Sequence, residues 1–229
     1  MPSFETTGHI IPYTVVRRPR RRRPAIQVDR DGEVRVLIPP GFRERDVPAL
    51  LRAHELFLRR HVLERPPVAH TFSDGDRFFY RGEPVVLRLR PAAQDAAHPT
   101  YSDGILTLAA LGPEEARARL RAWFLDEAAK DLGARVERWV PVVGRSPTGL
   151  RIRDYQSRWG YCRTDGLVAF NFRLIQAAPR VIDYVVVHEL VHLRHPHHQP
   201  AFWAAVKDVF GEAATARAWL REHNRELYW

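Results

Sequence analysis

One short segment of the sequence combines residue types that could do metal chemistry at a spacing that suits it. His188 and His192 lie four residues apart, and Glu189 directly follows the first histidine. On a helix, side chains four residues apart lie on one face, one turn apart. Two imidazoles so placed can bind one metal ion, and the carboxylate can take a proton from water bound to that ion. The segment predicts a zinc-dependent hydrolase with one Zn²⁺ ion and Glu189 as the general base.

A catalytic zinc site needs a third protein ligand and keeps one position open. Three histidines follow closely, at His195, His197 and His198. Pro196 disfavours helical backbone at His195 and should end the helix there, so the chain must turn. We expect the turn to bring His198 to the metal, with His195, His197 or a remote carboxylate as the alternatives. Three neutral imidazoles would leave the full charge of the divalent ion at the site.

The alternative without a metal site is a helix that carries two histidines and a glutamate by chance. The helix is otherwise strongly apolar, with a run of valines directly before His188. Burying three polar side chains in such a helix is costly unless they have a partner such as a metal ion. The apolar setting therefore favours a metal site.

Several elements should position this segment in an α+β fold. Proline residues open and close the predicted helices, and alternating apolar residues mark the strands. The expected helices are 47–62, 113–140 (with a weakness at Gly133), 180–194, 201–210 and 213–224, and the expected strands are 13–16, 25–28, 33–38, 78–80, 84–89, 101–108, 150–153 and 167–172. We expect residues 1–110 to form a β-rich N-terminal region and residues 111–229 to form the catalytic domain.

The bulk composition narrows the class of protein. The formal net charge of the 229-residue chain is +9, and nearly all of the positive charge is arginine. Arginine bias on a solvated surface is the simpler explanation, and association with nucleic acid through a basic surface is the alternative. The run Arg17–Arg23 is interrupted by proline and is expected to be a solvated strand edge or loop. A single cysteine, Cys162, no secretory signal and no apolar membrane span favour a cytoplasmic protein.

Further motifs lie on both sides of the histidine segment. Upstream, the chain reads Ser157-Arg158-Trp159-Gly160-Tyr161-Cys162 and then Asn171-Phe172-Arg173-Leu174, and downstream Phe202-Trp203 follows His198. In this combination the chain closely resembles the YgjP-like family of predicted metal-dependent hydrolases, relatives of the SprT-like and WLM zincins. The resemblance implies a zincin-like core with a small sheet and a metal-bearing helix, and metallopeptidase-like hydrolysis. Nucleoside triphosphate pyrophosphate hydrolysis at the same metal site is the alternative.

Three further residues are candidate substrate contacts. Arg158 could pair with a carboxylate or phosphate, although a structural salt bridge is as good an explanation. Tyr161 could donate to a developing negative charge, and it stands where the family usually has serine. His197 could contact substrate or lie in a solvated turn. Cys162 is expected to be a small buried hydrophobe, with a fourth metal ligand or a redox thiol as the alternatives.

These residues support a peptide or a nucleotide as the substrate. A hypothesis from another class is a nucleic-acid-associated module with a structural metal. A structural zinc site is normally closed by four ligands that include several cysteines, and this chain has one. The hydrolase is therefore the leading hypothesis.

Overall fold

The computed structural model describes residues 2–6, 8–28, 32–63, 70–91, 98–224 and 226–229. The chain divides into two compact units, Met1–Ala69 and His70–Trp229, and each has its own hydrophobic core. Residues 70–91 and 98–110, which were expected to belong to the N-terminal region, pack instead with the C-terminal unit. The functional division at residue 110 stays a prediction. Among the described residues, no helix combines the length and the apolar character needed to cross a membrane.

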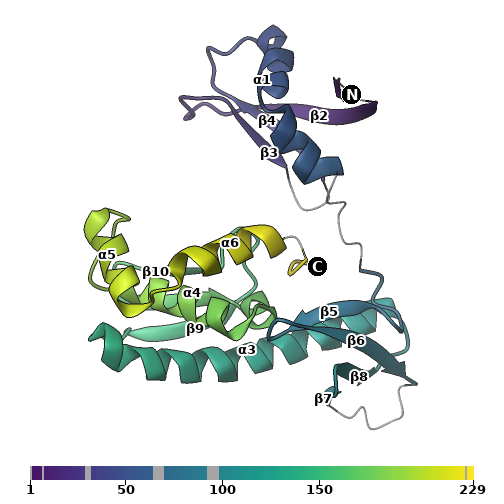
Figure 1. The fold of residues 1–229 in the computed structure, drawn as a ribbon. Coiled ribbons are helices and arrows are strands. Elements are labelled where there is room, and N and C mark those ends of the chain that lie inside the picture. The colour runs from purple at the N-terminus through teal and green to yellow at the C-terminus, as the bar shows by residue number, and fades with distance from the viewer. Residues whose placement is uncertain (1, 7, 29–31, 64–69, 92–97, 225) are drawn as a thin grey trace. The chain divides into compact units, whose positions relative to one another are not determined.

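The N-terminal unit is a four-stranded sheet with a helical segment against it (Figure 1). The strands run in the order β1-β2-β4-β3, with bounds β1 Ser3–Thr6, β2 His9–Arg17, β3 Ala25–Val28 and β4 Val34–Ile38. The strands predicted at 25–28 and 33–38 are confirmed as β3 and β4, which pair in antiparallel fashion. The predicted helix 47–62 is interrupted at His54, so that α1 Val47–Ala53 is followed by α2 Glu55–Leu58 and a π-helical turn at Arg59–Leu63.

The arginine run Arg17–Arg23 is exposed along its length and links β2 to β3. Its first member has structural partners: the guanidinium of Arg17 donates to the carbonyl of Pro40 at 2.9 Å and pairs with Glu44 at 3.0 Å. The remaining residues form a loop, which agrees with the simpler of the two sequence interpretations.

A second four-stranded sheet begins the C-terminal unit. Its order is β5-β6-β8-β7, with bounds β5 Arg77–Tyr80, β6 Glu83–Arg90, β7 Thr100–Ser102 and β8 Ile105–Ala109. The prediction of one strand over 101–108 was wrong, because the chain reverses at Asp103 and Gly104. Both residues have positive φ, 50° and 75°, which matches the left-handed turn that favours an Asp-Gly pair in hairpins.

The long helix α3 Pro113–Val143 forms the base of this unit and is continuous through Gly133. Its buried positions recur every fourth residue, as one face of a helix requires: Ala116, Leu120, Phe124, Ala128, Leu132 and Val136. The helix ends at Gly144, whose φ of 77° suits a residue without a side chain and whose N–H caps the carbonyl of Val140.

The remaining elements lie over α3. A three-stranded sheet has the order β10-β11-β9, with bounds β9 Gly149–Arg153, β10 Gly160–Cys162 and β11 Leu167–Asn171. Helix α4 Pro179–Val191 packs on both α3 and α6, followed in the chain by α5 Pro200–Val209 and α6 Ala213–His223 (Figure 1). The mixed α+β architecture, with a small sheet and a histidine-bearing helix, confirms the predicted fold class.

A buried carboxylate joins α3 to α4. Asp183 accepts a hydrogen bond from Trp139 at 2.9 Å and pairs with Arg135 at 2.7 Å and with Arg138. Its side chain is only 10% exposed, so the pairing is shielded from water.

Replacing Asp183 with alanine should lower the free energy of unfolding of the C-terminal unit by about 2–3 kcal/mol, because charged hydrogen bonds at a buried site are lost. Urea denaturation followed by tryptophan fluorescence measures the effect. Asp208→Ala on the exposed face of α5 is the control, and equal unfolding midpoints for the two variants would show that the interactions of Asp183 contribute nothing to stability.

Candidate metal centre

Helix α4 and its C-terminal end carry the candidate metal-binding and acid–base residues. Pro179 occupies its first turn, where a missing N–H costs nothing, and the apolar residues that follow are buried. His188 and Glu189 lie in its last turn, and His192 keeps helical backbone angles at its C-terminal end. The four-residue spacing therefore places both histidine rings on one face of the helix.

The chain then turns back, as Pro196 led us to expect. The N–H groups of Leu193 and His195 close the last turn onto the carbonyls of Leu190 and Val191. Helix α5 begins at Pro200, and Phe202 is fully buried, which anchors the end of the turn. This return brings His198 back to the end of α4.

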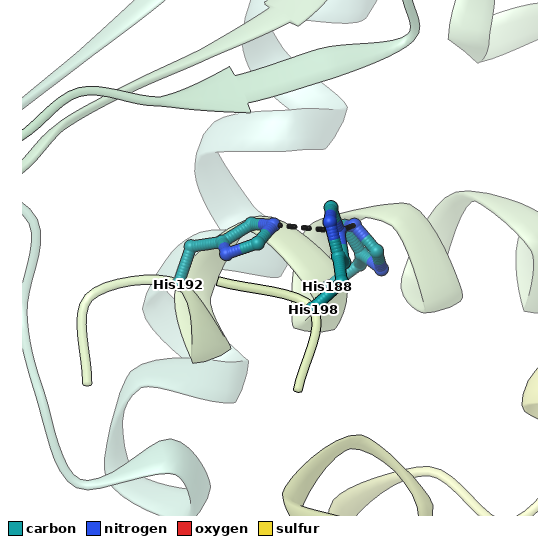
Figure 2. A group of neighbouring side chains, drawn as sticks. All are labelled: His188, His192 and His198. Carbon is teal, nitrogen blue, oxygen red and sulfur yellow. Dashed lines mark hydrogen bonds between the residues drawn. The ribbon is translucent and has the colours of Figure 1, made fainter. Parts of the chain in front are cut away.

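The three rings converge at their Nε2 atoms. His198 Nε2 lies 3.1 Å from His188 Nε2 and 3.1 Å from His192 Nε2 (Figure 2). A tetrahedron with metal–nitrogen bonds of 2.0–2.1 Å has an edge of roughly 3.3 Å, close to these separations. Among the described residues, these are the only three histidine, cysteine or acidic side chains grouped closely enough to hold one ion.

The protonation of His188 and His192 suits metal binding. Nδ1 of His192 donates to the carbonyl of His195 at 3.0 Å, which leaves Nε2 with its lone pair. Burial, together with the neighbouring imidazoles, lowers the pKa of His188 to about 3, and burial also lowers the pKa of His192. Neutral imidazoles whose nitrogen lone pairs face one another cannot hydrogen-bond to each other, but the same lone pairs can bind a divalent cation.

Aromatic neighbours hold two of the rings in place. His192 stacks on Phe202 with ring centroids 4.4 Å apart, and His198 stacks on Trp203 at 5.4 Å. On the other side, the hydroxyl of Tyr184 lies 3.5 Å from Nδ1 of His188. The Phe-Trp pair after His198 therefore has a local role, which is to fix the ring orientations.

Glu189 is buried against the sheet, with 6% of its surface exposed. Burial raises the pKa of its carboxyl to about 8, and the positive charge of Arg158 acts in the opposite direction. A cation held by the three imidazoles would lower that pKa further. The side chain is thus buried beside the histidine cluster, where a bound cation would favour its charged form.

Gly160 of β10 makes room for this carboxylate. A Cβ atom at position 160 would lie 2.8 Å from Cγ and 2.9 Å from Oε1 of Glu189, and 3.1 Å from the carbonyl of Ala169. No local sequence pattern marks this glycine as a functional residue. The contact joins residues 29 positions apart, and only its place beside Arg158 and Trp159 in the upstream motif hinted at a role.

Gly160→Ala should lower the catalytic rate on the order of 10²-fold while zinc stays bound, because the methyl group displaces the carboxylate and leaves the imidazoles untouched. Steady-state kinetics and metal analysis of the same preparation measure both quantities. Gly133→Ala in α3 is the matched control, since a Cβ atom there meets nothing within 4 Å. Full activity in Gly160→Ala would mean that the close contact does not position Glu189.

The structure does not bring all the predicted substrate contacts to one place. The guanidinium of Arg158 acts on Glu189 and lies over the ring of Tyr161 at 5.4 Å. Strand alternation puts Tyr161 on the sheet face opposite Gly160, where its hydroxyl is 3.4 Å from that of Tyr155. His197 is exposed and lines a pocket beside His192, and the half-buried Cys162 lines the same pocket.

Comparison with known proteins adds family information. Residues 22–223 match the sequence profile of the YgjP-like metallopeptidase domain. Comparison with curated proteins gives no significant match. A solved structure, the metallopeptidase zymogen abylysin of Pyrococcus abyssi, matches with 22% identity over 41% of this chain and 93% of that chain, at a TM-score of 0.37.

Proposed function

Because the chain belongs to the YgjP-like family of metallopeptidase domains, which makes it a metal-dependent hydrolase, we propose that it is a zinc-dependent peptidase. In this proposal His188, His192 and His198 hold a single zinc ion, and Glu189 is the general base. The observation that carries the proposal is the convergence of three imidazole Nε2 atoms at 3.1 Å beside a buried carboxylate.

Zinc is the metal that this donor set suits best. Three neutral imidazole nitrogens are typical of catalytic zinc sites, whereas calcium and magnesium prefer oxygen ligands. No fourth protein ligand joins the group in the described part of the chain, which leaves a coordination position for a reactant. A structural zinc would use a closed set of four ligands, so the open site favours catalysis over the structural alternative.

Glu189 would move the proton. When bound, zinc would supply Lewis acidity toward the water nucleophile and the scissile carbonyl. The carboxylate of Glu189, held by its contact with Gly160, accepts the proton of the water and delivers it to the leaving nitrogen. The guanidinium of Arg158 lies close enough to lower the pKa of Glu189 and could steady negative charge on the substrate.

The edge of the small sheet favours a peptide as the substrate. Among the strands that the structure describes, β10 pairs only with β11, and hydrogen bonds from the N–H of Arg163 to the carbonyl of Leu167 and from the N–H of Asn171 to the carbonyl of Trp159, both 2.8 Å, fix the register. The antiparallel pattern then directs the N–H and C=O groups of Gly160 and Cys162 away from β11. An extended peptide could pair with this edge as an added strand, directly beside Glu189.

The test is a substrate screen. Zinc-loaded protein is incubated with a peptide library and, separately, with nucleoside triphosphates, and the products are identified by mass spectrometry. We expect peptide cleavage that chelation abolishes and zinc restores. Hydrolysis of triphosphates without peptide cleavage would replace the peptidase by the nucleotide alternative, and hydrolysis that survives complete metal removal would contradict both.

A further inference from the structure

A pocket of about 410 Å³ lies next to the histidine cluster, within the range of roughly 300–1,000 Å³ that small-ligand sites occupy. Three segments form it: residues 145–148 after α3, residues 162–166 from the end of β10 to the start of β11, and residues 192–197 after α4. The pocket therefore touches the end of the edge strand at Cys162 and the cluster at His192. A peptide paired with the edge of β10 would therefore place a side chain beside this pocket.

The lining has two chemical characters. Leu193 and Pro196 supply apolar surface, while Arg145, Arg163 and the hydroxyl-bearing Ser146 and Thr164 supply hydrogen-bond donors. A ligand that satisfies both would carry a short apolar stem and a polar end that accepts hydrogen bonds. Glutamate and aspartate side chains meet that description.

The charge balance of the lining favours an anion. Arg163 pairs with Asp165 at 2.7 Å, so these two charges offset each other. Arg145 forms no ion pair with any acidic side chain that the structure describes. Its positive charge lowers the pKa of the Cys162 thiol, whereas burial and the charge of Glu189 raise that pKa. Within the described residues, no carboxylate therefore offsets the guanidinium charge of Arg145 in this lining.

We propose that this pocket is a specificity site that binds a carboxylate of the substrate through Arg145, so that the enzyme favours peptides with an acidic group beside the scissile bond. The inference rests on the proposed peptidase function and deepens it. The carboxylate can belong to an aspartate or glutamate side chain or to the C-terminus of the peptide, because the donors recognise the same group in each.

The test compares peptides that are identical except for glutamate, glutamine or lysine at one position flanking the scissile bond, each with a free or an amidated C-terminus. We expect kcat/KM for a carboxylate-bearing peptide to exceed that of its neutral counterpart roughly five- to tenfold, as for a charged hydrogen bond at a partly exposed site. If kcat/KM changes with the glutamate-to-glutamine replacement, the pocket binds an acidic side chain. If kcat/KM changes with amidation of the C-terminus, the pocket binds the terminal carboxylate. Equal values throughout would overturn the proposal.

Two variants separate a specific contact from a general charge effect. Arg145→Glu should abolish the preference and favour the lysine peptide, and Arg145→Gln should abolish it without reversal. Arg151→Glu makes the same charge change on β9, where residue 151 is exposed and pairs in register with Ala169, and it should leave the preference intact. The same reversal in Arg151→Glu would overturn the assignment to Arg145.

Binding distinguishes failure of the pocket from failure of the peptidase. Anisotropy of fluorescent peptides with zinc-loaded Glu189→Gln protein measures affinity without turnover. If the protein binds carboxylate peptides selectively but the wild type does not cleave them, the proposed binding pocket is supported and the peptidase function is contradicted. If the wild type cleaves peptides without selectivity, the peptidase function is supported and the carboxylate-binding pocket is contradicted. If inorganic triphosphate binds more tightly than the glutamate peptide and this binding is lost in Arg145→Glu, the pocket recognises a phosphate and the carboxylate proposal is overturned.

Discussion

Replacing Glu189 with glutamine should lower kcat/KM for peptide cleavage on the order of 10²–10⁴-fold while zinc remains bound with unchanged stoichiometry. The amide keeps the shape of the side chain and its contact with Gly160, but it cannot accept the proton from water. Because the carboxyl is 6% exposed and its pKa is raised to about 8, a neutral isostere should not destabilise the fold. The variant therefore isolates proton transfer from metal binding and from folding.

Kinetics, metal analysis and thermal unfolding of one preparation measure the three quantities together. Asp208→Asn is the matched control, since it makes the same chemical change at an exposed site on α5 and should leave all three unchanged. A Glu189→Gln protein that retains more than a tenth of the wild-type rate with zinc bound would remove Glu189 as the general base.

The second large effect is expected from replacing His198, the histidine that the turn after α4 brings back to the other two. In His198→Ala, zinc should no longer stabilise the C-terminal unit, and hydrolysis should fall more than about 10²-fold, because two imidazoles on one helix remain as the only ligands. At a free zinc concentration 100 times Kd, a ligand that binds only the folded protein stabilises it by about 2.7 kcal/mol. For a unit of this size that corresponds to a rise of about 5–10 °C in Tm.

Differential scanning calorimetry with and without zinc measures this shift. His197→Ala is a control of unusual value, because it removes the neighbouring imidazole, which is exposed and lies outside the three-ring group. We expect His197→Ala to keep the full zinc-dependent shift. A His198→Ala protein with that same shift would mean that the third imidazole does not bind the metal.

Much of the site follows from local sequence rules. The 3.6-residue period of an apolar helix dictates that His188 and His192 share a face, and Pro196 dictates a turn after them. The structure shows both features, and the turn brings His198 rather than His195 to the group, while His195 contributes its carbonyl to His192. Short-range patterns carry this information because few residues separate the parts.

Other features depend on contacts between distant segments, which periodicity does not encode. Strand β10 is three residues long and has no apolar alternation, so the sequence predicted neither the strand nor the faces to which Gly160 and Tyr161 point. The break of the 47–62 helix at His54 had no proline or glycine to announce it. By contrast, the Asp103-Gly104 turn had a local signal, and it was overlooked because the apolar residues around it suggested one strand.

Anomalous diffraction at the zinc edge, from crystals of the zinc-loaded protein, locates the ion that the three imidazoles are proposed to bind. We expect one peak bonded to Nε2 of His188, His192 and His198 at 2.0–2.1 Å, with a further coordination position that no protein atom fills. A peak at other ligands, or a closed site with four protein ligands, would contradict it.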